Sequence, residues 1–209
     1  VTMRLPAGAL DVERWGLRLR LHPLDNGCEK NLLFTPQMYE PVELAALAAE
    51  IGRGAAAGRP FVFVDIGANV GLFSLFVAAH AGNEARILAI EPEPGNRARM
   101  TFNIDANPGL PIRPVALALG AAEGELAIEL DRRDRGGTRT RAVEGATAGA
   151  VMVRCTTLWR LLRQEHIAAV DALKIDVEGN EAEVLVPFFR DAPETLWPQL
   201  ILIEDSRQL

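Results

Sequence analysis

From residue 61 onwards, short apolar runs alternate along the chain with longer helical patterns. Apolar runs of this length, bounded by glycine or proline, predict strands, and the segments between them predict helices. We expect strands over 61–66, 86–90, 112–116, 172–176 and 200–204, and helices near 70–81, 95–106, 157–166 and 180–189. Strands that are apolar throughout and separated by helices indicate the α/β class, with a doubly wound, mostly parallel sheet and helices on both faces.

The first sixty residues show a different pattern. Residues 17–21 read Leu-Arg-Leu-Arg-Leu, an alternation that predicts a half-buried strand. A turn at 25–27 leads to an expected return strand over 31–34, and a helix over 40–51 is expected to end at Gly52 and Gly54. We therefore divide the chain into an N-terminal extension, residues 1–60, with a strand pair and a helix, and a main domain, residues 61–209.

A second strand pair is expected between the third and fourth strands of the sheet. Its strands, 125–130 and 151–156, flank a long arginine-rich segment over 131–150. With so few apolar residues, this segment is interpreted as a solvated insertion in preference to a lid that grips a substrate.

Composition narrows the classes of partner. The 209 residues carry a net charge of −6, which argues against a nucleic-acid or anionic-membrane partner. Cys28 and Cys155 are the two cysteines, and they lack the spacing of a zinc cluster or a disulfide scaffold. We find no signal-peptide pattern and no apolar stretch long enough to span a bilayer, so we expect a cytoplasmic protein.

The most informative motif follows the first strand of the main domain. Residues 64–71 read Val-Asp-Ile-Gly-Ala-Asn-Val-Gly and open a helical pattern, the setting in which a glycine-rich turn brings backbone N–H groups close to a cofactor. A dinucleotide fingerprint requires glycine where this chain has Asn69 and Leu72. The turn of Gly67, Ala68, Asn69 and Gly71 instead fits one that binds S-adenosylmethionine.

Two acidic residues complete the predicted cofactor site. Asp65 precedes the turn and is the candidate partner of the methionine ammonium group, although it could also do no more than cap the turn. Glu91 ends the next strand, where an acid can accept hydrogen bonds from both ribose hydroxyls. Tyr39, the single tyrosine, either packs in the core or leans over this turn.

A second acidic cluster ends the fourth strand. Lys174, Asp176 and Glu178 alternate with apolar residues, so an extended segment would place the three charges on one face. In an open α/β sheet this end lies beside the first strand, facing the Asp65 site. Asp176 or Glu178 could act as general base towards an acceptor hydroxyl, with Lys174 in support. The alternative is an internal ion pair that only anchors the strand end.

Glu204 ends the fifth strand, so a divalent cation held by Asp176, Glu178 and Glu204 is a further possibility. The interpretation that we adopt includes no metal.

Together these segments resemble the FkbM-type methyltransferase family, a branch of the S-adenosylmethionine-dependent enzymes with the class I, Rossmann-like fold. The resemblance covers roughly residues 60–205. It implies methyl transfer, usually to a hydroxyl oxygen of a sugar, polyketide or other secondary metabolite, and it adds Pro92 and Ala116 to the cofactor site. The matching segments are 63–71 (FVDIGANVG), 91–92 (EP), 116–120 (ALALG) and 174–179 (KIDVEG), with Asn96, Asn103 and Glu181.

The chain departs from the family pattern at two places. Family members commonly carry an aspartate soon after the Thr-Leu that precedes the fourth strand, where this chain has Trp159. The fold usually continues into an antiparallel strand pair, whereas this sequence stops at Leu209. We expect either that the chain is truncated here or that the exposed sheet edge is covered by the N-terminal hairpin or by a partner chain, which makes a homodimer possible.

The sequence thus predicts an S-adenosylmethionine-dependent methyltransferase that acts on a small hydroxylated acceptor. Two alternatives stay open. The first is a scaffold that binds the cofactor without transferring a methyl group, and the second is a nicotinamide-dependent oxidoreductase.

Overall fold

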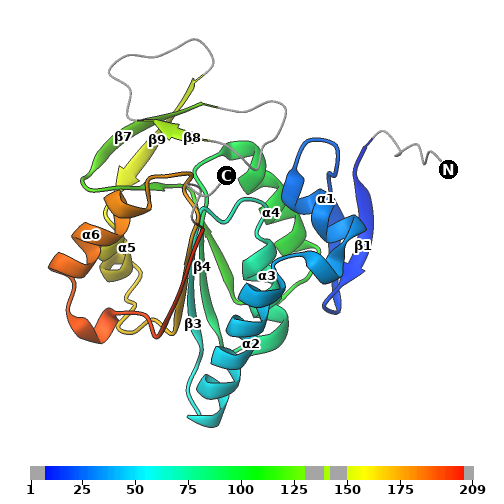
Figure 1. Cartoon of the computed structure of the whole chain (residues 1–209), viewed down its shortest axis with the longest axis horizontal. Coiled ribbons are helices and arrows are strands. Elements are labelled where there is room, and N and C mark those ends of the chain that lie inside the picture. The colour runs from blue at the N-terminus through cyan, green and yellow to red at the C-terminus, as the bar shows by residue number, and fades with distance from the viewer. Residues whose placement is uncertain (1–7, 130–138, 142–149, 205–209) are drawn as a thin grey trace.

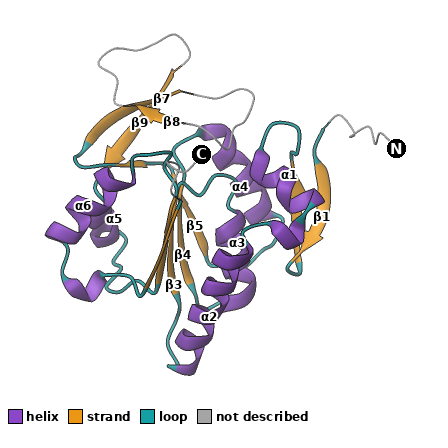
Figure 2. Ribbon diagram, viewed as in Figure 1, coloured by secondary structure: helices purple, strands orange, loops and turns teal. Residues whose placement is uncertain are grey.

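The core of the molecule is a parallel sheet with helices on both faces (Figures 1 and 2). The computed structural model describes residues 8–129, 139–141 and 150–204. In these residues the sheet has the order β11-β10-β3-β4-β5, and every neighbouring pair is parallel. The predicted parallel sheet is therefore confirmed, with each strand within one residue of its expected bounds. The strands are β3 (Val62–Ile66), β4 (Arg86–Ile90), β5 (Ile112–Val115), β10 (Ala172–Ile175) and β11 (Leu200–Ile203).

Alternate residues of each strand face two separate apolar cores. Phe63 belongs to the core beneath α2, α3 and α4, while the next residue, Val64, belongs to the core beneath α5 and α6. This is why the strands are apolar on both faces of the sheet. The helices, which Figure 2 shows on either side of the sheet, are α2 (Pro41–Ala56), α3 (Leu72–Ala81), α4 (Pro94–Asp105), α5 (Leu158–Gln164) and α6 (Glu181–Asp191).

Strands β3 and β10 lie side by side although more than one hundred residues separate them. From β3 the chain proceeds to β4 and β5 on one side, whereas β10 and β11 extend the sheet on the other. The sheet order therefore reverses between these two strands, and ligands of open α/β sheets bind at the carboxyl ends of such a pair. In the register of the pair, Lys174 lies directly opposite Asp65.

The N-terminal hairpin differs from the prediction. Strand β2 (Leu17–Leu21) is present as expected, but it pairs with the preceding β1 (Leu10–Arg14), and the expected return strand over 31–34 belongs to helix α1 (Gly27–Phe34). Trp15 and Gly16 both have positive φ, which the tight two-residue hairpin turn requires. Asn26 caps α1 by accepting a hydrogen bond from the Glu29 amide.

Helix α2 runs through both glycines that were expected to end it. Gly54 packs so closely on Phe61 that an added Cβ would lie 3.2 Å from the ring, so the small residue permits helix-to-strand contact. The helix ends two residues before Gly58, which has a φ of +67°. The expected connector over 52–60 is therefore mostly helical.

Two asparagines, Asn103 in α4 and Asn107 just after it, join the hairpin to the main domain. Asn103 accepts a hydrogen bond from the Arg20 amide at 2.7 Å and donates to the Arg20 carbonyl at 3.3 Å. Asn107, one helical turn later, makes the same two bonds with Arg18 at 2.9 and 2.7 Å. Their side-chain amides thus pair with β2 much as a neighbouring strand would. The division of the chain at residue 60 stays a prediction, but the extension shares one core with α3.

A smaller sheet lies above α5 and α6 in Figure 1, in the order β6-β9-β7-β8. The predicted pair is confirmed as β7 with β9, which are antiparallel. Apart from β8, the arginine-rich segment lies outside the described residues, so neither interpretation of it is tested. The strands are β6 (Ala118–Leu119), β7 (Gly124–Glu129), β8 (Arg139–Arg141) and β9 (Ala150–Thr156), and short 3₁₀ helices cover Pro36–Met38 and Glu194–Leu196.

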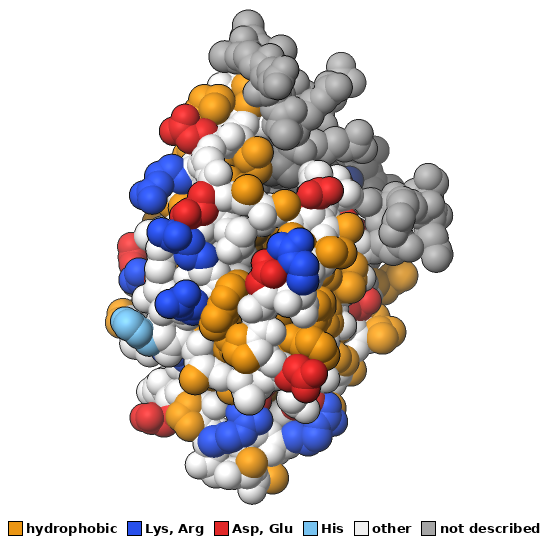
Figure 3. All heavy atoms as spheres, turned by 90° about the vertical axis from the view of Figure 1, so that its left-hand side faces the viewer, with side chains coloured by type: hydrophobic (Ala, Val, Ile, Leu, Met, Phe, Trp, Pro, Cys, Tyr) orange, Lys and Arg blue, Asp and Glu red, His pale blue; other side chains and the backbone are white. Residues whose placement is uncertain are grey.

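Strand β11 forms one edge of the large sheet, and among the described strands only β10 pairs with it. The expectation that the hairpin covers this edge is wrong, because the hairpin packs against α4. Hydrophobic side chains gather on the face that carries α6 (Figure 3), and Val186, Trp197 and Ile203 are among the exposed ones. The predicted homodimer stays a prediction. None of the described helices combines the length and apolarity needed to cross a bilayer.

The asparagine contacts give a first prediction. Asn103→Ala leaves two backbone groups of β2 unpaired in a buried place, so we expect a loss of about 2–3 kcal/mol in the free energy of unfolding. Asn107→Ala removes the equivalent bonds at a more exposed position, where water replaces them, so we expect about 1 kcal/mol or less. Urea denaturation measures both. Equal losses in the two variants would show that burial does not increase the contribution of the Asn103 hydrogen bonds to stability.

Candidate functional site

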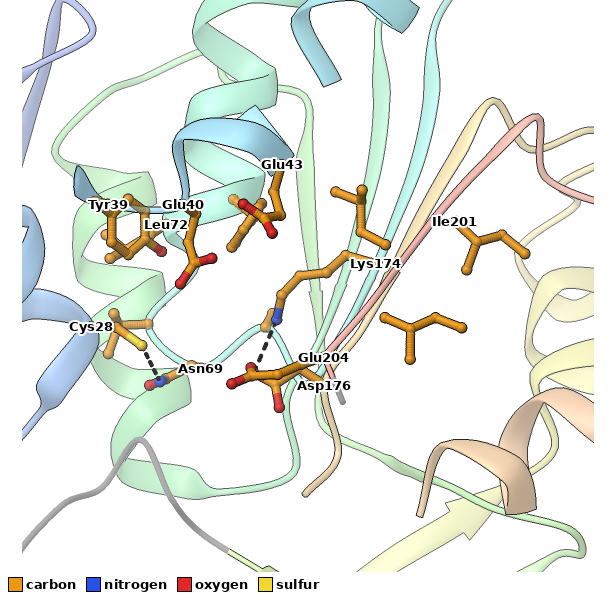
Figure 4. Close-up of a pocket in the computed structure, with 15 residues that line it drawn as sticks. Cys28, Tyr39, Glu40, Glu43, Asn69, Leu72, Lys174, Asp176, Ile201 and Glu204 are labelled. Carbon is orange, nitrogen blue, oxygen red and sulfur yellow. Dashed lines mark hydrogen bonds and ion pairs between the residues drawn. The ribbon is translucent and has the colours of Figure 1, made fainter. Parts of the chain in front are cut away.

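A cavity of about 320 Å³ opens at the carboxyl ends of β3, β10 and β11 (Figure 4). Three parts of the chain form it: the extension, the turn after β3, and the ends of β10 and β11. The position agrees with the expected crevice where the strand order reverses. Its lining residues are Cys28, Tyr39, Glu40, Glu43, Ala68, Asn69, Val70, Leu72, Phe73, Lys174, Asp176, Ile201, Leu202, Ile203 and Glu204.

Close packing of the backbone explains both glycines of the turn. Gly67 has a φ of +71°, and a Cβ placed there would overlap the carbonyl oxygen of Asp176. Gly71 has a φ of +82°, and its Cβ would lie 2.7 Å from the side chain of Met100. The turn can therefore approach β10 and α4 only without side chains at these two positions.

The sequence had suggested that the backbone N–H groups of the turn lie close to a cofactor, but three of them donate hydrogen bonds within the protein. Those of Gly67 and Ala68 donate to the Ile90 carbonyl at 3.0 and 2.9 Å. The N–H of Asn69 donates to Oε2 of Glu91 at 2.8 Å. These hydrogen bonds hold the turn against the end of β4. Ala68 and Asn69 nevertheless line the cavity, together with Val70.

Asp65 lies beneath the turn and is completely buried. Its Oδ2 accepts hydrogen bonds from the Ser74 amide at 3.2 Å and the Ser74 hydroxyl at 2.7 Å, so it ties β3 to the first turn of α3. Oδ1 is buried and has no hydrogen-bond partner among the described residues. Burial raises the pKa of Asp65, and the charge of Lys174 opposes that shift. The hydrogen bonds of Oδ2 agree with the interpretation that Asp65 caps the turn. A contact between Asp65 and the methionine ammonium group of the cofactor stays a prediction.

Glu91 ends β4 and is nearly buried. Besides Asn69, its carboxylate accepts a hydrogen bond from the Glu93 amide at 2.8 Å, and burial raises the pKa of Glu91 to about 7 in spite of these bonds. The two other predicted cofactor residues lie at neighbouring strand ends: the Pro92 carbonyl accepts a hydrogen bond from Arg97, and Ala116 is exposed just past β5. These three residues border the strand ends next to the cavity without lining it.

The structure brings Lys174 and Asp176 together, as predicted. The Lys174 ammonium lies 3.3 Å from Oδ2 of Asp176 and 5.1 Å from the centre of the Phe73 ring (Figure 4). Burial alone would lower the pKa of Lys174, but the carboxylates of Asp176 and Asp65 outweigh it and raise that pKa. Lys174 is therefore held in its charged form.

Glu178 does not share this face. Strand β10 ends at Ile175, and the chain then turns, with Glu178 in the left-handed region at a φ of +55°. The expected alternation therefore stops three residues before Glu178, and Glu178 is not among the residues that line the cavity. Its role as a base stays a prediction. No set of three His, Cys, Asp or Glu side chains suited to a metal occurs within residues 8–129, 139–141 and 150–204.

Three further acids line the cavity. Glu40 and Glu43 come from the start of α2, and sequence reasoning missed both, because no local pattern shows that α2 begins at the cavity. Glu204 was considered only as a possible metal ligand. A hydrogen bond with the Asp176 carboxyl, together with burial, raises the pKa of Glu204 to about 7. Glu204 therefore stays protonated up to about pH 7 beside the Asp176 carboxyl.

The extension also holds the turn itself. The Nδ2 group of Asn26 donates to Oδ1 of Asn69 at 2.9 Å, and the Sγ atom of Cys28 lies 3.9 Å from Nδ2 of the same Asn69. Asn69 has a φ of +53°, a conformation that asparagine tolerates better than most residues. Tyr39 both packs and lies at the cavity, since it is buried against Phe73 and belongs to the lining.

Comparison with a solved structure defines the class of fold. A SAM-dependent methyltransferase from Agrobacterium tumefaciens matches 98% of this chain with a TM-score of 0.51 at 13% sequence identity, and the match covers 55% of that protein. The predicted class I methyltransferase fold is therefore confirmed.

Sequence comparison defines the family. The methyltransferase FkbM domain matches residues 65–208, and the chain therefore belongs to this family. S-adenosylmethionine is the cofactor that family and fold assign to it. Hexuronic acid methyltransferase AglP from Haloferax volcanii is 29% identical over 124 residues, which cover 59% of this chain and 48% of the relative. Methyltransferase sdnD from Sordaria araneosa is 31% identical over 156 residues, covering 61% of this chain and 60% of the relative.

The packing of the turn gives a second prediction. Gly67→Ala adds a clash with the Asp176 carbonyl to the strain of a positive φ, so we expect a loss of about 3–5 kcal/mol in the free energy of unfolding. Gly58→Ala is the matched control, because its φ is +67° and no atom lies within 4 Å of the added Cβ. We expect a loss of about 1–2 kcal/mol there. If chemical denaturation gave equal losses, close approach would not be the reason for Gly67.

Proposed function

We propose that the chain transfers the methyl group of S-adenosylmethionine to a hydroxyl oxygen of a sugar or another secondary metabolite, with Asp176 as the general base. One observation carries the proposal. The Asp176 carboxylate is partly exposed in the cavity at the strand-order reversal and is hydrogen-bonded to a half-buried lysine. The name of the Haloferax volcanii relative, a hexuronic acid methyltransferase, supports the sugar as acceptor class.

The residues at the strand ends fit the cofactor. S-adenosylmethionine carries positive charge on its ammonium and sulfonium groups, and when bound it supplies an electrophilic methyl group. Asn69 and Val70 would hold it at the turn, and Glu91 would hold the ribose at the end of β4. The buried Oδ1 of Asp65, which has no partner among the described residues, is an acceptor beneath the same turn.

The chain's own residues have to position the acceptor oxygen and take up its proton. Asp176 is fixed for this, because its N–H donates to the Ile66 carbonyl at 3.0 Å and its carbonyl packs on Gly67. Lys174 orients the Asp176 carboxylate through the 3.3 Å contact between them. Apolar side chains at the end of β11 and on α3 limit the water around it. Alignment and proton removal of this kind supply much of the acceleration in such displacements.

The base assignment gives a third prediction. Asp176→Asn keeps the shape of the side chain but removes its basicity, so we expect the rate of methyl transfer to fall about 100-fold or more. Binding of S-adenosylhomocysteine should change by less than about threefold, since the cofactor groups are intact. Glu178→Gln is the comparison, because Glu178 lies outside the cavity lining, and it should retain most of the activity.

Two other results of this experiment would contradict the proposal. A larger loss in Glu178→Gln than in Asp176→Asn would exchange the roles of the two acids. Cofactor binding without transfer to any hydroxylated acceptor would favour the scaffold hypothesis.

The carboxyl pair gives a fourth prediction. Up to about pH 7 the protonated Glu204 carboxyl is hydrogen-bonded to Asp176 and makes it a poorer base, whereas above pH 7 Glu204 is ionised, since the pKa of Glu204 is about 7. The rate should therefore rise with pH around 7 and level off above it. In Glu204→Gln the neighbour does not titrate, so the rise around pH 7 should disappear. An unchanged pH profile in this variant would show that the ionisation of Glu204 does not control the rate.

A further inference from the structure

We infer that the cavity admits an acceptor that is uncharged or carries an ammonium group at its reacting end, and that it rejects one that carries a carboxylate there. In sugar terms, a hexose or a hexosamine fits and a hexuronic acid does not. The inference rests on the proposed methyl transfer and adds the charge of its acceptor.

The charges of the lining carry the argument. Among the residues that the structure describes, the lining has four acids, Glu40, Glu43, Asp176 and Glu204, and one basic residue, Lys174. Figure 4 shows the carboxylates of Glu40 and Glu43 directed towards the same space as those of Asp176 and Glu204. The rest of the lining is apolar or uncharged. A ligand therefore meets a negatively charged wall.

Lys174 does not offer a binding site for an acceptor carboxylate. Its ammonium is bonded to Asp176, packs over the Phe73 ring and lies opposite the buried Asp65 in the strand register. It thus balances carboxylates that belong to the protein. An incoming anion would compete with Asp176 for this cation and would disturb the proposed base.

Two of these acids hold their protons more tightly than usual. Burial and the neighbouring Glu43 raise the pKa of Glu40, and a hydrogen bond with the Asp176 carboxyl, together with burial, raises that of Glu204. A cation in the cavity favours the ionised form of such groups, and a further anion disfavours it. The cavity is thus electrostatically suited to a neutral or cationic acceptor.

The residues that create this wall come partly from outside the family match. Glu40 and Glu43 precede residue 65, where the match to the FkbM domain begins. The acceptor preference of this chain can therefore differ from that of a relative that shares the matched domain, including the one named as a hexuronic acid methyltransferase.

A matched set of acceptors tests the inference. The protein is incubated with methyl-labelled S-adenosylmethionine and phenyl β-D-glucoside, phenyl β-D-glucosaminide or phenyl β-D-glucuronide, and kcat/KM is measured for each. We expect the glucuronide to react at least tenfold less efficiently than the other two. Glu43→Gln should narrow that gap severalfold, whereas Glu84→Gln, at the opposite end of the sheet, should leave it unchanged. Equal or better use of the glucuronide would overturn the inference.

The charge of the cavity can also be measured without any acceptor. Cys28 lines the cavity, so in a Cys155→Ser background its thiol is the single reporter. We compare its labelling by a cationic methanethiosulfonate, the trimethylammonium reagent, with labelling by the anionic sulfonate reagent, relative to free cysteine. The cationic reagent should be favoured at least tenfold, and Glu43→Gln should reduce this preference. A preference for the anionic reagent, or none, would contradict the inference.

The two experiments separate the inference from the proposed function. No methyl transfer to any of the three glycosides, combined with preferred cationic labelling of Cys28, would reject the sugar acceptor and retain the charge of the cavity.

Discussion

The site depends on one backbone contact, the approach of Gly67 to the carbonyl of Asp176. It joins the loops that follow β3 and β10, two strands that are neighbours in the sheet but distant in sequence. Because no side chain intervenes, the Asp176 amide can reach the Ile66 carbonyl, and the Asp176 carboxylate is directed into the cavity beside Lys174. The turn, the proposed base Asp176 and the lysine are therefore positioned together. A glycine that first suggests contact with a cofactor has its visible role in packing the protein against itself.

The N-terminal extension is as much a part of the site as the parallel sheet. Asn103 and Asn107 pair with β2 and hold the hairpin on α4. From that anchor the chain reaches the turn, where Asn26 is bonded to Asn69, and then begins α2 at the cavity. The matched family domain thus contains the residues proposed to hold the cofactor and to act as base, while the extension supplies much of the opposite side of the cavity.

Sequence patterns predicted the parts that local periodicity controls. The strands of the large sheet follow from short apolar runs, and the Lys174–Asp176 pair follows from alternation within a strand. Prediction failed where contacts distant in sequence matter. Helix α2 continues through Gly54, which packs on Phe61, and the turn after Ile175 removes Glu178 from the expected face. The hairpin partner of β2 precedes it in the chain, and residues 31–34 are helical. The acids of α2 and Glu204 reach the cavity through tertiary packing alone, which no spacing along the chain reveals.

The most direct test of the account is a calorimetric titration of the protein with S-adenosylhomocysteine, with NADH titrated in parallel. The account predicts one site with a Kd in about the micromolar range for S-adenosylhomocysteine and much weaker binding of NADH. Tighter binding of NADH, or no binding of S-adenosylhomocysteine, would contradict the assignment of the cavity and its neighbouring strand ends to a methyltransferase.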